Sequence, residues 1–356
     1  MSPRHIAWFC AVIVAVTANA APVAITDFAD AVQPQVAVAP GGRIHVVFGK
    51  ANAIFHASSS DGRAFSPPVK VGELDKLALR MRRGPRIAAS DTSIVITAIS
   101  HADGDLHAWT SADRGATWTE GARVNESAHS AREGLHAMAG DGRGLIAAVW
   151  LDSRSGRNQL WSRVSRAGGR AWEPEVRVYE SPDGHICECC HPSVAIGPRG
   201  EIFAMCRNWL DNARDLWMAE SRDGGRTFAA AQKLGAGTWK LNACPMDGGA
   251  LAVGPTGAPA AVWRRERAIF AGWTGTEKKL AEPAAQPVLA GSPRLFLAWE
   301  QDGSVMISRP DAAHPDTLAR NARAPAMAAL PGGGVIVVWE STATGTAPLQ
   351  AEIVKP

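Results

Sequence analysis

Short apolar segments recur along the chain, and each is preceded by a second apolar segment and a turn containing Gly or Pro. In the first of these units, Gln35–Val38 leads through Pro40-Gly41-Gly42 to Ile44–Phe48. Runs of four to seven residues bounded by such turns are typical of β-strands rather than helices. The seven apolar segments that have a polar exit are Ile44–Phe48, Ile94–Ile99, Ile146–Trp150, Ile202–Cys206, Ala260–Trp263, Leu295–Trp299 and Val335–Trp339. The pattern therefore predicts an all-β chain of seven similar units.

A turn motif, Ser-x-Asp-x-Gly-x-Thr-aromatic, repeats inside these units. Complete copies begin at Ser111 and Ser221, a degenerate copy begins at Ser165, and a shortened copy begins at Ser59. The starting serines are 52, 54 and 56 residues apart. The Asp carboxylate can accept backbone N–H groups and Gly supplies a positive φ, so the motif predicts hairpin turns. A fixed period of this length indicates a repeat architecture.

These copies resemble the Asp-box, or BNR, repeats of the sialidase (neuraminidase) β-propeller superfamily. The resemblance implies a propeller of four-stranded antiparallel blades with Asp-box hairpins, and a non-sialidase member is favoured. Seven units favour seven blades, with the six of sialidases as the alternative. We expect residues 21–356 to form this single domain, with Val23–Phe28 closing the last blade. The 35 Gly and 13 Trp fit this prediction, because Gly turns hairpins and Trp packs blades together.

Residues 1–20 have the three parts of a secretory signal peptide. Arg4 is basic, Ile6–Val16 is apolar, and Ala18-Asn19-Ala20 has the form of a cleavage site. The rest of the sequence has no apolar run long enough to span a membrane. We therefore expect a periplasmic protein, with full secretion as the alternative. The formal net charge of +3 gives no strong attraction to nucleic acid or acidic membranes, and we expect a monomer.

Five cysteines remain after removal of the signal peptide, and an odd number cannot all pair in disulfides. Cys187, Cys189 and Cys190 precede the inner strand of the fourth unit, Cys206 ends its second strand, and Cys244 precedes the inner strand of the fifth unit. In a propeller these positions share one face of two adjacent blades. The cysteines are therefore expected to gather near one mouth of the central channel.

Thiols, imidazoles and a thioether in one place favour a soft metal, copper as Cu(I) first and zinc as its competitor. The predicted ligands are Cys187, Cys189, Cys190, Cys206, Cys244, Met246, His185 and His191. Such a protein would acquire, deliver or buffer copper, with another exported metal-handling or membrane transport protein as its partner. The alternatives are structural disulfides that pin the two blades together, redox chemistry of the thiols, and a propeller that only binds a partner protein.

The resemblance also implies a second function, that of a sialidase-like glycan-active or glycan-binding protein. A sialidase uses a Tyr–Glu nucleophile pair, and the only tyrosine here is Tyr179, followed by Glu180. Neighbours in a strand point to opposite faces, so these two residues cannot form the pair. Tyr179 is also expected on an outer strand, far from the channel. An exo-sialidase reaction is therefore disfavoured, and no catalytic residue is predicted.

Overall fold

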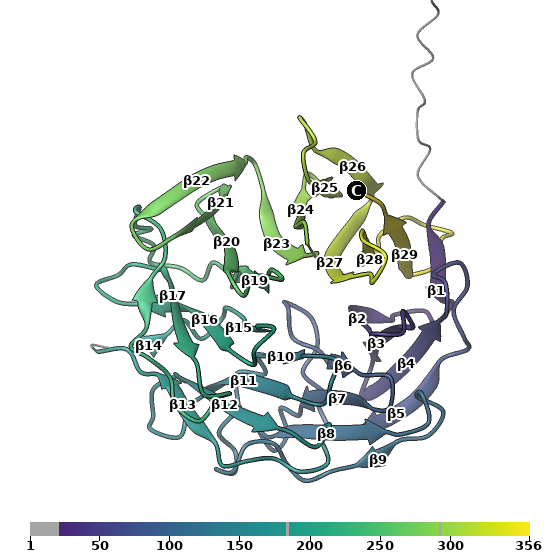
Figure 1. The fold of residues 1–356 in the computed structure, drawn as a ribbon, viewed down its shortest axis with the longest axis horizontal. Helices are drawn as coiled ribbons and strands as arrows, with labels where there is room; N and C mark the ends of the chain where they lie inside the picture. Colours follow the sequence, from purple (N-terminus) through teal and green to yellow (C-terminus); the bar gives the residue numbers. More distant parts are fainter. Residues whose placement is uncertain (1–20, 183–184, 292) are drawn as a thin grey trace, which may run out of the picture.

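The described residues of the computed structural model, 21–182, 185–291 and 293–356, form seven β-sheets arranged in a ring (Figure 1). Blade 1 contains β2 (Val32–Val38), β3 (Ile44–Lys50), β4 (Ala53–Ser59) and β5 (Val69–Glu73). Blade 2 contains β6 (Arg86–Ala89), β7 (Ile94–Ile99), β8 (Leu106–Ser111) and β9 (Thr119–Glu120). Blade 3 contains β10 (His136–Gly140), β11 (Ile146–Asp152), β12 (Gln159–Ser165) and β13 (Val176–Tyr179). Blade 4 contains β14 (His185–Ile186), β15 (Ser193–Ile196), β16 (Ile202–Trp209), β17 (Leu216–Ser221) and β18 (Gln232–Lys233).

The remaining three blades complete the ring. Blade 5 contains β19 (Ala250–Val253), β20 (Pro259–Arg265), β21 (Ala268–Trp273) and β22 (Thr276–Ala281). Blade 6 contains β23 (Ala285–Ala290), β24 (Phe296–Gln301), β25 (Ser304–Ser308) and β26 (Asp316–Arg320). Blade 7 contains β27 (Ala322–Ala329), β28 (Val335–Ser341), β29 (Leu349–Val354) and β1 (Val23–Thr26).

The fold confirms the all-β propeller, and it confirms seven blades rather than six. Each of the seven apolar segments of the sequence forms the second strand of a blade, beginning with β3 and β7. β1 pairs antiparallel with β29, so a strand from the N-terminal part of the chain closes the last blade as expected. No described segment forms a helix that could cross a membrane. The signal peptide prediction falls on residues 1–20, outside the described part of the chain.

The hydrophobic core lies between neighbouring blades. One cluster joins Ile44 and Phe48 of blade 1 to Ile336 and Val338 of blade 7. Trp150, Trp299 and Trp339 are among the largest fully buried side chains, which confirms that the repeated tryptophans pack the blades. Burial of such rings contributes much of the favourable free energy of folding.

The Asp-box turns have the hydrogen bonds that the motif predicts. In blade 2 the Asp113 carboxylate accepts the backbone N–H of Thr117 at 2.9 Å and its hydroxyl at 2.6 Å. The Gly115 N–H donates to Ser111 Oγ at 2.8 Å. These bonds, those from Thr117 first, lower the pKa of Asp113 to about 2. Each turn is therefore fixed locally by its own residues.

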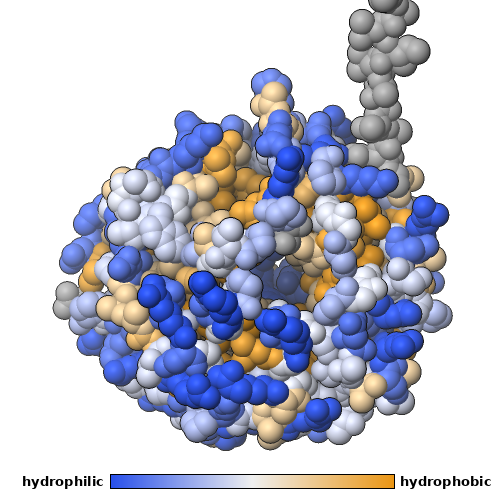
Figure 2. Space-filling view, in the orientation of Figure 1, coloured by the Kyte–Doolittle hydropathy of each residue, from blue (hydrophilic) through white to orange (hydrophobic). Residues whose placement is uncertain are grey.

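Strand connectivity separates the two faces of the ring. In an antiparallel blade the turns after the first and third strands lie at one end, which carries the Asp boxes. The turn after the second strand and the loop into the next inner strand lie at the other end. Figure 2 shows a hollow at the centre of the ring with hydrophilic residues gathered around it. The cysteine-rich loop before β15 thus lies on the face opposite the Asp boxes.

Candidate metal centre

The cysteine-rich loop is held between two short strands that pair with the same strand, β16. β14 pairs with the end of β16 at Trp209 and Asn208, and β15 pairs with its beginning, from Met205 to Ile202. The Cys187 N–H continues the β14 ladder by donating to the Arg207 carbonyl at 2.8 Å. The intervening residues, 187–191, therefore bulge out of the sheet at a fixed position.

Three thiols converge inside this bulge. The Sγ atoms of Cys187 and Cys190 lie 3.3 Å apart, those of Cys187 and Cys189 lie 3.5 Å apart, and those of Cys189 and Cys190 lie 3.9 Å apart. In an extended chain Cys187 and Cys189 would point to one side and Cys190 to the other. The loop does turn, with the Cys190 N–H donating to the Cys187 carbonyl at 3.4 Å. We call these residues, Cys187, Cys189 and Cys190, the thiol trio.

The thiol trio is the only group of three or more Cys, His, Asp or Glu ligand atoms within 4.8 Å of one another among the described residues. Cys187 and Cys190 are buried, and Cys189 is half-buried. The five described cysteines are all free thiols. A buried set of soft donors with one member open to solvent is suited to a soft metal ion.

The three thiols do not ionise alike. Hydrogen bonds from Cys189 and then Cys190, together with the Arg214 charge, hold the pKa of Cys187 well below its ordinary value. The same contact with Cys187 raises the pKa of Cys189, and burial raises that of Cys190. Without a metal, the thiol trio therefore holds one negative charge readily and resists a second.

Two buried arginines supply positive charge beside the thiol trio. Arg207 is 1% exposed, and its guanidinium donates to the carbonyls of Asp247, Arg214 and Arg264 rather than to a carboxylate. Arg214 is 3% exposed, lies 3.9 Å from a Glu188 oxygen, and has no hydrogen-bond partner for Nη1 among the described residues. The Arg207 charge lowers the pKa of Cys190, as the Arg214 charge lowers that of Cys187. The surroundings therefore favour thiolates.

The other two predicted cysteines lie outside the thiol trio. Cys206 is buried in an apolar cluster with Leu151 and Val178, and burial raises its pKa. Cys244 is exposed, and its thiol is close enough to contribute to the raised pKa of Cys189. Cys244 is thus the next available sulfur, whereas Cys206 is part of the blade packing.

The remaining predicted ligands have separate environments. His185 stacks on Trp209 with ring centroids 5.9 Å apart. His191 is half-buried, lies with Nε2 3.2 Å from the Gly249 carbonyl oxygen, and has no partner for Nδ1 among the described residues. Burial, and then Arg82 and Arg86 of the second blade, lower the pKa of His191, so its imidazole is neutral. Met246 is half-buried on the loop that carries Cys244.

Tyr179 lies at the end of β13, the outermost strand of blade 3, as the sequence predicted. Its hydroxyl accepts the Asn208 amide at 2.9 Å, and its ring stacks on Trp217 at 5.7 Å. Burial raises the pKa of Tyr179 to about 12. Glu180 instead accepts the amide of Gln159 at 2.7 Å. The two residues therefore have different partners and do not form a Tyr–Glu pair.

Sequence reasoning missed two features of this site. β14 is two residues long, and nothing in its composition distinguishes it from the loop around it. Arg214 follows β16 in a turn, and its proximity to the thiol trio depends on pairing between β16 and β17. The informative property of Arg207 is its nearly complete burial, which its position in the sequence does not show.

Comparison with known proteins agrees with the repeats and the fold. Residues 85–259 match the family model described as a BNR repeat-like domain. Together with the seven-bladed ring and the Asp-box turns, this match identifies the chain as a β-propeller with BNR repeats. No curated protein matches the sequence.

Several solved structures share the fold at low sequence identity. A Dyadobacter fermentans protein of unknown function is 14% identical with a TM-score of 0.56, over 94% of this chain and 98% of that one. The α-L-arabinofuranosidase of Fusarium graminearum is 14% identical with a TM-score of 0.54, over 95% and 98% of the two chains. The leech intramolecular trans-sialidase is 11% identical with a TM-score of 0.58, over 96% and 70%. At these identities the likeness shows the fold alone.

Proposed function

We propose that this protein binds one soft metal ion, Cu(I), through the sulfurs of Cys187, Cys189 and Cys190. The observation that carries the proposal is the convergence of three thiols 3.3–3.9 Å apart. A point equidistant from sulfurs at these separations lies about 2.1 Å from each, and a metal slightly above their plane reaches a metal–thiolate distance of about 2.3 Å. Little rearrangement is therefore needed to bind an ion.

Copper is favoured over zinc by the number of donors. Structural zinc is almost always held by four ligands in a tetrahedron. Within the described residues, no fourth Cys, His, Asp or Glu donor joins the thiol trio inside 4.8 Å. Cys244 is the available fourth sulfur and Met246 the available thioether, so movement of their loop would be needed to complete a zinc site. Three thiolates already satisfy a soft monovalent ion.

Charge balance supports the same proposal. Three thiolates and one Cu(I) ion carry a net charge of −2, which is costly to bury without compensation. Arg207 and Arg214 are two buried cations whose charges already act on Cys190 and Cys187. A metal–thiolate centre would therefore be neutralised by groups that the fold has placed beside it.

The exposure of the site favours a role in handling copper rather than in structure. Cys189 is half-buried and Cys244 is exposed on the adjacent loop. An incoming sulfur or departing ion can thus reach the thiol trio from one side. We propose that the protein works in the periplasm as a monomer that acquires, delivers or buffers copper, with an exported metal-handling or membrane transport protein as its partner.

The direct test is a Cu(I) titration of the reduced chain without oxygen, against a competing chromophoric chelator. Structural zinc sites bind with about 10–16 kcal/mol through four ligands, so each thiolate contributes about 3–4 kcal/mol. Cys189→Ser should then weaken Cu(I) binding by about 100- to 1,000-fold. Cys206→Ala is the matched control, because it removes a thiol outside the trio and should leave the affinity unchanged.

Two further measurements sharpen the result. Cys244→Ser should leave Cu(I) affinity within about twofold of the parent but weaken zinc binding, because only zinc needs a fourth ligand. The intact mass after alkylation of the freshly prepared protein should show five reactive thiols, whereas two disulfides would support the stapling alternative. Equal Cu(I) affinity of the parent and Cys189→Ser would overturn the proposal.

A further inference from the structure

A polar pocket lies between blades 1 and 2 on the Asp-box face, opposite the thiol trio. Its volume is about 320 Å³, at the lower end for small-molecule sites and equal to the space of about ten water molecules. Blade 1 contributes the β2–β3 turn and Ser60, and blade 2 contributes the β6–β7 turn and Arg114. The pocket therefore has room for a ligand of the size of one sugar.

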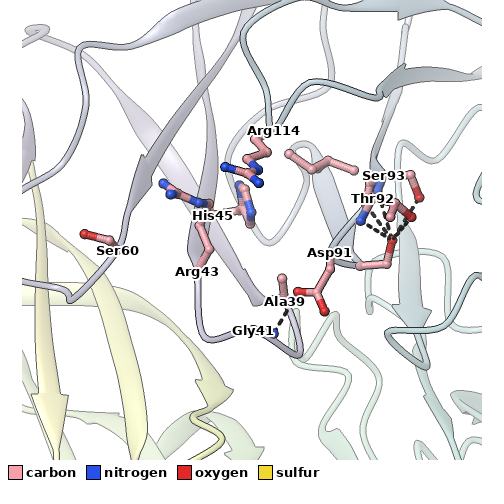
Figure 3. Close-up of a pocket in the computed structure, with 11 residues that line it drawn as sticks. Ala39, Gly41, Arg43, His45, Ser60, Asp91, Thr92, Ser93 and Arg114 are labelled. Atoms are coloured by element: carbon pink, nitrogen blue, oxygen red, sulfur yellow. Dashed lines mark hydrogen bonds between the residues drawn. The ribbon is translucent and has the colours of Figure 1, made fainter.

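Two arginines give this pocket its charge. Arg43 and Arg114 both line it, and Figure 3 shows their guanidinium groups on either side of the His45 imidazole. Neither guanidinium has an ion pair or hydrogen bond with another described residue. The acidic lining residue, Asp91, already accepts the Gly41 N–H at 2.7 Å. The lining thus carries two positive charges and one negative charge, and the two guanidinium groups, which have no acidic partner, favour a carboxylate or phosphate oxyanion.

Neutral hydrogen-bonding groups line the rest of the pocket. The hydroxyls of Thr92 and Ser93 lie across the pocket from the arginines in Figure 3. His45 Nδ1 is 3.0 Å from His56 Nε2, and its own Nε2 has no partner in the described part of the chain. Burial, His56 and Arg43 lower the pKa of His45 to about 3, so its imidazole is neutral. Hydroxyls and a neutral imidazole are suited to ligand hydroxyl groups.

The residue type at Arg114 sets this turn apart from the equivalent turns of two other Asp boxes. Arg114 is the third residue after the first serine of its Asp box and has a φ of 62°. The equivalent residues of two other Asp boxes are Gly168 and Gly224, with φ values of 61° and 71°. All three turns have the same 2.8 Å bond from the next Gly N–H to the serine hydroxyl. A left-handed φ favours glycine. Arg114 therefore occupies a position at which the turn conformation favours glycine over arginine.

We infer that this pocket binds a sugar-sized ligand carrying one oxyanionic group, with Arg43 and Arg114 on the oxyanion and the hydroxyls and His45 on the ligand's hydroxyl groups. The oxyanion is the carboxylate of a sugar acid or the phosphate of a sugar phosphate. The site is separate from the thiol trio and does not depend on the proposed metal function.

Three probes and two variants test this inference by calorimetry at low ionic strength. Galactose is neutral, galacturonate carries a carboxylate, and galactose 6-phosphate carries a phosphate on the same ring. At least one charged sugar should bind about tenfold or more tightly than galactose, since a hydrogen bond to a charged group is worth more than a neutral one. The preferred probe then distinguishes a sugar acid from a sugar phosphate.

Arg114→Gly gives this turn the residue found in the two equivalent turns, so it should fold and keep or raise the unfolding midpoint. It should also weaken binding of the charged sugar by about tenfold or more. Arg63→Gln removes a charge from the neighbouring Asp box outside the pocket and should leave the affinity unchanged. Equal binding of all three sugars, no binding of any of them, or unchanged affinity in Arg114→Gly would overturn the inference.

Discussion

Loading the thiol trio with Cu(I) at pH 7 should release about two protons from the protein. Thiolates at Cys187 and Cys190, 3.3 Å apart, would repel each other by about 5 kcal/mol at an effective dielectric constant of about 20. For Cys189 and Cys190, 3.9 Å apart, the repulsion is about 4 kcal/mol. Such energies raise the pKa for the loss of a second proton by about three from the ordinary thiol pKa of 9.0. The metal-free trio therefore carries one thiolate, and metal binding must displace the other two protons.

Proton release can be measured by titration calorimetry in two buffers with different enthalpies of ionisation. The apparent Cu(I) affinity should also rise with pH, by about two decades per pH unit between about pH 6 and 8. Cys189→Ser supplies the control, because it removes one of the protonated thiols and should release about one proton. An affinity that does not change with pH, or release of less than one proton by the parent, would refute this account of the thiol trio.

Three other predictions test the charges around the fold. Arg214→Met removes a buried cation, so thiolate absorbance should show a higher pKa for Cys187, and Cu(I) affinity should fall about tenfold. Burial raises the pKa of Glu352 to about 7 from the ordinary value of 4.5 that it has in the unfolded chain. The folded protein therefore loses stability as the pH rises from 4.5 toward 7. Glu352→Gln should therefore gain in unfolding midpoint over the parent at pH 8 but not at pH 4, and an equal gain at both would contradict this. Hydrogen bonds depress the pKa of Asp113 and Asp223, so these two carboxylates stabilise the fold above about pH 4 and lose that effect as the pH falls below it. A melting midpoint that is constant from pH 5 to pH 2 would contradict this.

The architecture could be predicted from the sequence because its signals are local. A second strand such as Ile44–Phe48 is apolar because it is buried between two blades, and each Asp box forms its hydrogen bonds within about seven residues. β1 and β29 lie at opposite ends of the sequence. Their pairing can still be expected, because without β1 the last blade would leave β29 as an unpaired edge strand. These features depend on the spacing of hydrophobic residues and on the residue types in turns, and both involve residues that are close together in the sequence.

The candidate site could be predicted only as far as its face of the ring. Ala204 and Cys206 pack against blade 3, whereas Phe203 and Met205 pack toward blade 5. This alternation places Cys206 in the core between blades rather than in the loop with the thiol trio, and the period of two along β16 already contained that information. The approach of Arg214 to Cys187 depends on long-range pairing, which no local pattern encodes.

The pocket on the Asp-box face was also absent from the sequence interpretation. A comparison of the Asp-box copies shows Arg114 where two others have Gly168 and Gly224, so part of its signal is present in the sequence. The other part is not, because Arg43 reaches the same cavity from a turn of the neighbouring blade. Alignment of repeats finds unusual residues, but only packing shows which of them meet.

The most direct test of the central claim is X-ray absorption at the copper edge on the protein loaded with one equivalent of Cu(I). The account predicts three sulfur scatterers at a metal–thiolate distance of about 2.3 Å, and loss of one sulfur in Cys189→Ser but not in Cys206→Ala. A shell of nitrogen or oxygen atoms, or a sulfur shell that is unchanged in Cys189→Ser, would contradict a metal centre at the thiol trio.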